Sequence, residues 1–380
     1  MLSPSDDHDL LRETFRRFAI EQLLPVYSRW KTEPFPRSLL RELGSLGALG
    51  IPIAPEFGGS GGTRVQLGVA AEEIGRGDFN VTGFLQLGAI ADLLLRDADP
   101  SVKERWLPAI AGGEAIPSFG LTEPSVGSDA ARLTMTARHD RGDVVLRGEK
   151  ASITFAGCAD VCLVFARTGG DGSRGISVFA VPLDLPGVSR AVYPSAGGTL
   201  TQRGSLFFDD VRIPANHQIG ADGTGFIGAM LAFDFNRAII ALAAIGAAAQ
   251  SLDETMDYAK TRETFGRPIA RHEGVAFQIA EHLAHVHAAR LVSYEVLMLA
   301  DLRRPHTSQA AMAKWLGPKA ATDAIHACVI LNGWPGYGAD LPLMQRLNDV
   351  MGLEIGDGTP ELMKAVIARE AMGREFSSYR

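Results

Sequence analysis

Cysteine is scarce in this chain, which has three cysteines in 380 residues. Cys158 and Cys162 are separated by three residues in a strand-like stretch, and no CxxC or histidine pair completes a set of metal ligands. Three cysteines also cannot build the disulfide framework that is typical of small secreted domains. We therefore expect buried free thiols in a reducing compartment and no metal site.

Excess positive charge and long apolar runs are also missing. Lysine and arginine number 37 against 44 aspartates and glutamates, so the net charge of −7 does not favour a nucleic-acid partner. No apolar run reaches the roughly 20 residues of a membrane span, and residues 1–8 are polar and acidic rather than a signal peptide. These absences predict a cytoplasmic protein with neither nucleic acid nor a membrane as a partner.

Three stretches of the chain have different hydrophobic patterns. Up to about residue 116, apolar residues recur at helical spacing, and we expect Pro25 to end the first helix. From 118 to 213 short apolar strands alternate with glycine-rich turns. After 220 the pattern predicts long helices at 224–250, 250–264, 275–301, 308–332 and 359–374. The predicted fold is α+β, with an N-terminal helical domain (1–117), a central β-sandwich or barrel domain (118–219) and a C-terminal four-helix bundle (220–380).

Common nucleotide-binding and hydrolytic motifs are absent or lack their context. Residues 223–228 match the dinucleotide fingerprint GxGxxG, which requires a strand before it and an acidic residue about 20 positions later. Here an irregular loop precedes the motif and an alanine-rich helix follows, so we interpret it as a glycine-rich helix start. The loop 58–63 lacks the Lys-Ser/Thr pair of a phosphate-binding loop, and neither GxSxG nor HExxH occurs.

Four segments in order carry a more specific signal. They are FGLTEPSVGSD at 119–129, FDDVRIP at 208–214, RETFGRP at 262–268 and IGDGT at 355–359. Together they resemble the acyl-CoA dehydrogenase family over essentially the whole chain. The resemblance implies that family's fold, FAD as cofactor, an acyl-CoA substrate, a homotetramer and electron transfer to an electron-transferring flavoprotein.

The resemblance also implies a catalytic base. Desaturating an acyl thioester removes a proton from Cα and a hydride from Cβ, so a base and a flavin must be held in register. The family usually has Glu before Gly-Thr, and this chain has Asp357, which is shorter by about one C–C bond, ~1.5 Å. Some relatives carry the base at the position of Asn236, which cannot accept the proton. The alternative is that Asp357 only shapes the turn 356–358.

Two groups of binding residues follow from the same resemblance. Arg262 is expected to meet the FAD diphosphate of a neighbouring subunit, because a guanidinium matches phosphate geometry. An alternative for the substrate group places Phe233 in the core, Asp234 in solvent and Arg237 in a structural ion pair. The residues expected to contact FAD are Leu121, Thr122, Gly127, Ser128, Ile153, Thr154, Arg262, Phe265, Gly333 and Thr359. Those expected to contact acyl-CoA are Ser128, Phe233, Asp234, Arg237 and Gly358.

Three positions depart from the family pattern. Ser152 stands where the family usually has a tryptophan beside the flavin. The smaller residue either opens space for a bulkier substrate or a shifted flavin ring, or is compensated by a neighbour such as Phe155. Glu273 replaces a common glutamine, and Trp334 follows Gly333 where Gly-Gly is common. The last two departures affect the end of the site expected to hold adenine.

Three functions follow from these observations. An aspartate base together with Ser152 resembles the cyclohexanecarboxyl-CoA dehydrogenase branch, so the leading hypothesis is desaturation of a cyclic or branched acyl-CoA. The alternative is a flavin monooxygenase of the same fold that acts on a small amine or aromatic, although such relatives usually lack the carboxylate base. A flavin-bearing nucleic-acid-binding relative is disfavoured by the net charge of −7.

Overall fold

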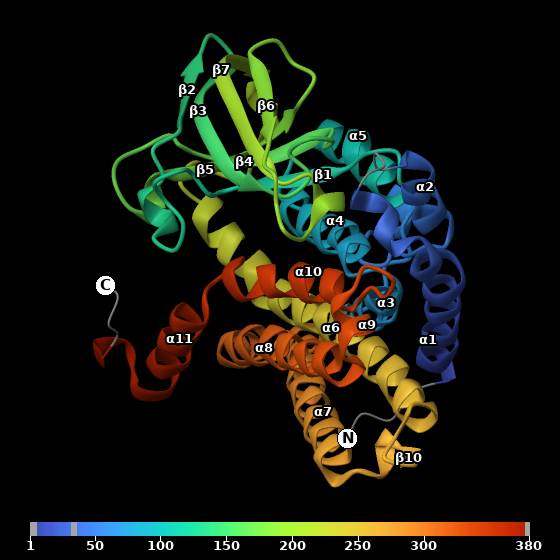
Figure 1. The fold of residues 1–380 in the computed structure, drawn as a ribbon. Coiled ribbons are helices and arrows are strands. Elements are labelled where there is room, and N and C mark those ends of the chain that lie inside the picture. Colours follow the sequence, from blue (N-terminus) through green and yellow to red (C-terminus); the bar gives the residue numbers. More distant parts are fainter. Residues whose placement is uncertain (1–5, 32–35, 377–380) are drawn as a thin grey trace.

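The computed structural model describes residues 6–31 and 36–376, which form a helical region, a β region and a second helical region in chain order (Figure 1). The helix α3 starts with a capping box between Thr63 and Gln66, and α5 starts with Asp99 accepting from the Ser101 amide. The helices of the first region are α1 (Asp6–Phe18), α2 (Arg37–Ser45), α3 (Arg64–Gly77), α4 (Thr82–Leu95) and α5 (Pro100–Ala111).

The predicted end of the first helix at Pro25 is wrong. The chain continues from α1 through a helical turn at Ala19–Leu23 into the 3₁₀ segment η2 (Leu24–Lys31). Pro25 is the second residue of η2, where a missing N–H is tolerated because the first amides of a helix have no partner anyway.

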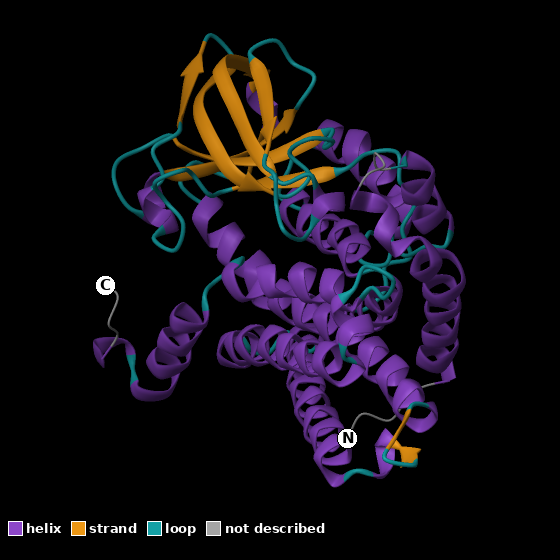
Figure 2. Cartoon of the chain, in the orientation of Figure 1, coloured by secondary structure: helices purple, strands orange, loops and turns teal. Residues whose placement is uncertain are grey.

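The β region is one curved mixed sheet of eight strands (Figure 2). Its order is β6-β7-β3-β2-β4-β5-β8, and β1 pairs in parallel with β4. Strands β1 to β7 lie within one residue of the stretch 118–213 in which the sequence predicts strands, and β8 follows just beyond it. In β6 four of the five residues are exposed, so no alternation of buried and exposed positions marks it. The strands are β1 (Pro117–Gly120), β2 (Thr136–Asp140), β3 (Asp143–Ile153), β4 (Val161–Arg167), β5 (Ile176–Pro182), β6 (Val188–Val192), β7 (Gly204–Pro214) and β8 (Gln218–Ile219).

The C-terminal region is built around one long helix. The helices predicted at 224–250 and 250–264 are a single 37-residue helix, α6 (Gly225–Thr261), because no proline or helix-ending glycine interrupts it. The helix at 343–355 was missed. A two-stranded hairpin, β9 (Glu263–Thr264) and β10 (Arg267–Pro268), follows α6. The remaining helices are α7 (Glu273–Asp301), α8 (Thr307–Asn332), α9 (Trp334–Tyr337), α10 (Leu343–Ile355) and α11 (Pro360–Met372).

Helix α6 is also the one helix in the described part of the chain that is long and apolar enough, by length and composition, to cross a membrane. Its most apolar window has a mean hydropathy of 1.6, and 61% of that window is buried inside the protein. Small residues let α3 lie directly against it, since a Cβ on Gly246 would come within 2.0 Å of the Glu72 carbonyl oxygen. Its apolar character is therefore that of a core helix.

The carboxylate of Asp349 in α10 connects all three regions. It accepts hydrogen bonds from the Tyr27 hydroxyl in η2 (2.6 Å), the Asn80 amide (2.9 Å) and the Gly198 backbone amide of the β region (2.6 Å). Gln345, one turn earlier in α10, donates a fourth bond (2.8 Å). Burial raises the pKa of Asp349, and the four donors act in the opposite direction.

The loop that reaches Asp349 from the β region approaches α10 closely. A Cβ on Gly197 would lie 2.4 Å from the carbonyl oxygen of Asn348, so a larger residue would push the loop away from the carboxylate. The three regions are therefore held in register by one buried acceptor and a close backbone contact.

We expect Asp349→Asn to lower the midpoint of thermal unfolding by several degrees. An amide offers one acceptor oxygen where the carboxylate offers two, so buried donors lose partners at a cost of about 1–3 kcal/mol each. Asp257→Asn on the exposed face of α6 is the matched control and should shift the midpoint by roughly 1 °C or less. Equal midpoints for the two variants, measured by circular dichroism, would show that the junction contributes nothing.

Candidate active site

The loop after β1 carries four of the predicted site residues and is held from below by a buried ion pair. Lys150 in β3 donates to the carbonyl oxygen of Leu121 (3.1 Å) and to the Glu123 carboxylate (2.8 Å). Glu123 also accepts from the amides of Thr134 and Met135. Both charged side chains are almost completely inaccessible to solvent. The loop is therefore anchored at Leu121 and Glu123.

The ion pair shifts the pKa of both partners. Burial lowers the pKa of Lys150 to about 8, although the Glu123 carboxylate acts in the opposite direction. Burial would raise the pKa of Glu123, but Lys150 and the two amides hold it below its usual value. Neither charge can lose its partner without leaving a buried, uncompensated group.

The end of β3 lies beside this loop. The amide of Ala151 donates to the carbonyl oxygen of Thr122 (2.9 Å), which joins the last residues of β3 to the loop. Ile153 is buried and Thr154 is half-buried. Arg203 donates to the Ser152 carbonyl oxygen (2.8 Å) and to the Thr154 hydroxyl (3.0 Å). The guanidinium of Arg203 thus lies at Ser152, one of the positions where the sequence departs from the family pattern.

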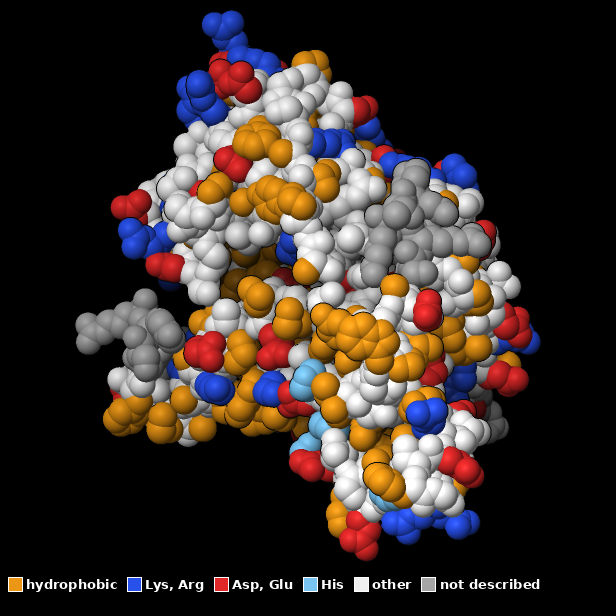
Figure 3. All heavy atoms as spheres, in the orientation of Figure 1, with side chains coloured by type: hydrophobic (Ala, Val, Ile, Leu, Met, Phe, Trp, Pro, Cys, Tyr) orange, Lys and Arg blue, Asp and Glu red, His pale blue; other side chains and the backbone are white. Residues whose placement is uncertain are grey.

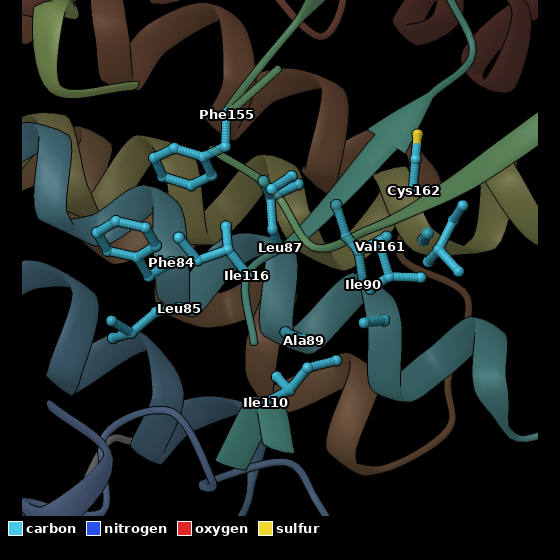
Figure 4. Close-up of a cluster of buried hydrophobic side chains, with 14 of the residues drawn as sticks. Phe84, Leu85, Leu87, Ala89, Ile90, Ile110, Ile116, Phe155, Val161 and Cys162 are labelled. Carbon is cyan, nitrogen blue, oxygen red and sulfur yellow. The ribbon is translucent and has the colours of Figure 1, made fainter. Parts of the chain in front are cut away.

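Phe155 does not cover Ser152. Its ring is fully buried and stacks on Phe84 of α4 with centroids 4.3 Å apart and planes within 3° (Figure 4). Ser152 is exposed, so the two side chains lie in different environments. The interpretation that Phe155 compensates for the missing tryptophan is therefore wrong, and Arg203 is the neighbour that contacts this segment.

The predicted base lies on the turn between α10 and α11. Asp357 is exposed and has a φ of +56°, a left-handed conformation that costs about 1–3 kcal/mol and that aspartate tolerates better than most residues. Lys314 of α8 donates to the carbonyl oxygens of Leu353 (2.6 Å) and Gly358 (3.0 Å), on either side of the turn. Thr359 follows as the cap of α11 and accepts from the Leu362 amide (3.3 Å).

Two buried cations lie near Asp357. Burial lowers the pKa of Lys314 to about 8, with Asp357 and Glu354 acting to raise it and Arg237 acting to lower it. Burial also lowers the pKa of Arg237 from its usual range, and Asp234 and Asp357 oppose this shift. The turn therefore carries a negative charge toward a positively charged part of the helical region.

Arg237 lies on the first half of α6 with the other predicted substrate residues. It donates to Asp234 (3.1 Å), which also accepts from Thr307 (2.7 Å), so Asp234 is not simply solvated. The buried Nε of Arg237 has no hydrogen-bond partner within the described residues. Phe233 contacts Phe119 of β1 edge to face at 5.4 Å, which links this helix to the strand before the loop. A structural ion pair for Arg237 is thus present, but it leaves one buried donor free.

These two groups flank a depression in the surface. Figure 3 shows a hollow between the β region and the C-terminal helices, with apolar side chains at its floor. The loop 121–128 follows β1 on one side, and α6 and the turn after α10 lie on the other. An elongated ligand could lie between the two.

The structure does not bring Arg262, Phe265 and Gly333 to this hollow. Arg262 follows Arg237 by about 25 residues, which at ~1.5 Å per helical residue places them roughly 38 Å apart. Phe265 is 97% exposed at the tip of the hairpin after α6. Leu331, just before Gly333, packs against the same end through the Ala259–Ile269 cluster. These three predicted residues form a separate group at the far end of the chain's helical region.

Sequence reasoning missed Lys150, Arg203 and Lys314. The one available signal was for Lys314, a lysine within the small apolar face Ala310, Ala311, Ala313 and Gly317 of a predicted helix, where burial of a charge implies a specific partner. No group of three or more His, Cys, Asp or Glu side chains among residues 6–31 and 36–376 is arranged to hold a metal ion.

Comparisons with known proteins agree along the whole chain. Models of the acyl-CoA dehydrogenase family match its N-terminal domain at 5–114, its middle domain at 118–211 and its C-terminal domain at 223–372. The mitochondrial short-chain specific acyl-CoA dehydrogenase of Rattus norvegicus is 35% identical, covering 99% of this chain and 91% of the rat protein.

Solved structures show the same fold. A chain from the structure reported for the electron transferring flavoprotein of Acidaminococcus fermentans is 30% identical with a TM-score of 0.95, covering 98% of this chain and 99% of that one. PigA with FAD and proline is 25% identical with a TM-score of 0.94, covering 98% of this chain and all of the other.

By its fold and site, the protein is a flavin oxidoreductase. It belongs to the acyl-CoA dehydrogenase family, whose members use FAD and oxidise the CH–CH bond of an acyl-CoA.

The residues of this chain fit FAD. Within the described residues, the backbone amides of Ser125, Gly127 and Ser128 donate no hydrogen bond, and these residues are exposed. A Cβ on Gly127 would meet nothing within 4 Å, so a ligand can approach its backbone. Thr154 is half-buried just after β3, which meets this loop through the hydrogen bond from the Ala151 amide to Thr122. Thr122, Gly127, Ser128 and Thr154 are at least partly exposed, whereas Leu121 and Ile153 are buried, and the individual roles of all six toward FAD stay predictions.

We expect Lys150→Met to destabilise the protein by about 3–5 kcal/mol, because it leaves Glu123 buried without its counter-charge. The double variant Glu123→Gln/Lys150→Met removes both charges and should recover a large part of that loss. Urea denaturation of the two variants and the wild type gives the comparison. If the double variant is less stable than the single one, the charge account of this anchor is wrong.

The lowered pKa of Lys150 predicts that the free energy of unfolding depends on pH. The unfolded chain keeps the lysine proton up to about its usual pKa of 10.5, whereas the folded protein releases it near pH 8. Between these values the unfolded state binds more protons, so the part of the free energy of unfolding that is linked to the Lys150 proton rises from about pH 8 to pH 10.5 and is lost as pH falls back through about 8, in addition to the loss that Lys150→Met shows at neutral pH. The stability difference between wild type and Lys150→Met should therefore grow from pH 8 to 10, and a constant difference would contradict it.

Proposed function

We propose that the protein desaturates a cyclic or branched acyl-CoA at the Cα–Cβ bond, with Asp357 as the base. The observation that carries this proposal is the position of the Asp357 carboxylate, on a left-handed turn close to the buried cations Lys314 and Arg237. A carboxylate held on a turn at the rim of the hollow can reach a ligand within it without a large rearrangement.

The residues around the hollow have different roles in the proposed reaction. Asp357 takes the proton from Cα, and the pair of electrons left behind forms the new double bond as the hydride leaves Cβ. FAD, when bound, accepts that hydride. The Phe233 ring is partly exposed on the α6 side, where we infer that it packs against the thioester end of the substrate, and the buried Arg237 beneath it holds Asp234 and supports the ring. The anchored loop 121–128 orients the flavin against it.

Ser152 and Asp357 are both smaller than the residues that the family usually has at these positions, and they indicate the shape of the substrate. Ser152 is small and exposed, Phe155 is packed away from it against Phe84, and Arg203 contacts the carbonyl oxygen of Ser152 rather than its side chain, so we infer that the space of an indole ring is open on the side-chain face. Asp357 reaches ~1.5 Å less far than glutamate would, which suits a substrate whose Cα lies closer to the turn. A ring satisfies both conditions because it is wider than a straight chain and fixes the Cα–Cβ torsion.

We further propose that the protein is a cytoplasmic homotetramer that passes electrons to an electron-transferring flavoprotein. Phe265, Phe277, Ile330, Trp334 and Tyr337 are all more than half exposed, and large apolar surfaces of this kind usually meet a partner. Figure 3 shows apolar side chains gathered over α9. Arg262 and Phe265, remote from their own hollow, would then serve FAD in a neighbouring subunit. A monomeric mass of the purified protein in analytical ultracentrifugation would contradict this assembly.

We expect Asp357→Asn to retain FAD and to lose flavin reduction by acyl-CoA under anaerobic conditions, with a rate at least ~100-fold below wild type. Asparagine keeps the shape and the left-handed turn but cannot take a proton. Asp340→Asn, in an exposed loop of the same region, is the matched control and should reduce at the wild-type rate. Bleaching of the visible absorption band of the bound flavin is the measurement. An unchanged rate in Asp357→Asn would remove it as the base.

A panel of acyl-CoA substrates tests the prediction that the substrate is cyclic. Cyclohexanecarboxyl-CoA should reduce the wild-type flavin at least ~10-fold faster than butyryl-CoA or octanoyl-CoA, and Asp357→Glu should narrow that ratio because the carboxylate moves outward by ~1.5 Å. Equal rates with straight and cyclic substrates would exclude the alicyclic assignment while leaving the desaturation intact. Free proline and aromatic amines complete the panel, and reduction by these alone would favour the amine-directed alternative.

A further inference from the structure

The turn that carries Asp357 is held by a side chain from a different helix, Lys314 of α8. We propose that Lys314 of α8 is a positioning residue for the base: its ammonium group holds the carbonyl oxygens of Leu353 and Gly358 and so fixes the turn that presents the Asp357 carboxylate. This inference rests on the proposed function of Asp357 and adds a residue that acts on it through the backbone.

The geometry places the lysine across the whole turn. Leu353 lies in the last turn of α10, whose final carbonyl groups have no partner within the helix, and Gly358 directly follows Asp357. Lys314 Nζ bonds both oxygens at 2.6 and 3.0 Å. A cation at a helix C-terminus is also favoured by the helix dipole. One ammonium group thus closes the segment that contains the base.

Burial makes these contacts specific. Lys314 is 1% exposed, and it lies among small side chains of α8 that pack against α6. A buried ammonium must satisfy its donors locally, and two of its three go to the turn. Within the described residues the charges that face it are Asp357 on the turn, Glu354 on α10 and Arg237 on α6. Its position is therefore determined by the same groups that surround the base.

The backbone at Asp357 needs such a support. Asp357 has a φ of +56° and Gly358 a φ of +110°, so two successive residues leave the conformations that side chains prefer. The remaining backbone bonds near the turn, from Gly356 to Gly352 and from Met363 to Thr359, belong to the two helices and do not cross between them. Lys314 is the side chain that connects both ends. Because a displacement of about 1 Å can cost 100-fold in rate, its loss should act on the chemical step.

The test uses the FAD-loaded protein and three substitutions. Lys314→Met keeps the length of the side chain but removes the charge and the donors, and Lys314→Arg keeps both. Lys319→Met is the matched control, because Lys319 lies on the same helix with its side chain half exposed and paired with Asp323. The measured quantities are the limiting rate of anaerobic flavin reduction, the substrate concentration at half-saturation, FAD content and amide hydrogen exchange of residues 353–361.

We expect Lys314→Met to bind FAD normally, to reduce it ~10- to 100-fold more slowly than wild type, and to change half-saturation by no more than ~3-fold. Lys314→Arg should recover at least part of the rate, and Lys319→Met should match wild type. Exchange across 353–361 should be faster in Lys314→Met alone. A lysine with only a structural role would instead lower FAD content and stability without separating the rate from substrate binding.

Either of two results would contradict the role proposed for Lys314. If Lys314→Met reduces its flavin as fast as Lys319→Met, or if exchange across the turn is unchanged, the proposal is wrong. Should Lys314→Met fail to fold, Lys314→Gln, which keeps donors without the charge, is measured in the same way and judged by the same criteria. Failure of the wild type to react with any thioester would overturn the proposed function, whereas the exchange measurement would still decide whether Lys314 holds the turn.

Discussion

The buried carboxylate of Asp349 is the contact on which the relative position of the three regions depends. It takes donors from η2, from Asn80 next to α4, from the β-region loop at Gly198 and from its own helix. The hollow lies between the β region and the C-terminal helices, so its width is set by how these regions meet. Because Asp349 is in α10, the helix that ends at the turn with Asp357, the same element joins the regions and delivers the base.

Around the hollow the chain buries charged groups in matched sets. Lys150 pairs with Glu123 below the loop of residues 121–128, and Lys314 and Arg237 lie near Asp357 below the turn. Burying such charges is costly unless they are paired and hydrogen-bonded, so their presence marks segments whose positions matter more than their contribution to stability. The result is a rigid frame that holds two exposed features, the free amides of the loop and the carboxylate of the turn.

The sequence predicted the order of helical and β regions because hydrophobic periodicity is a local property, and the family motifs located the loop at 121–128 and the turn at Asp357. Local patterns could not show that residues 225–261 form one helix, since nothing in the pattern distinguishes a continuous helix from two abutting ones. They also could not find Arg203, whose partners are far away in the chain, and a lysine among small apolar residues of a predicted helix was the one sign of Lys314. The suggestion that Phe155 replaces the missing tryptophan failed for the same reason: its stacking partner is Phe84, about 70 residues earlier. Tertiary contacts decide these cases.

The central claim is that the turn after α10 presents Asp357 to the Cα of an acyl thioester across from the flavin. A crystal structure with FAD and a non-oxidisable cyclohexanecarboxyl-CoA analogue tests it most directly. We expect an Asp357 carboxylate oxygen within about 3–3.5 Å of Cα, on the face opposite the flavin, with Lys314 still bonded to Leu353 and Gly358. A structure in which Asp357 points to solvent and another group contacts Cα would contradict it.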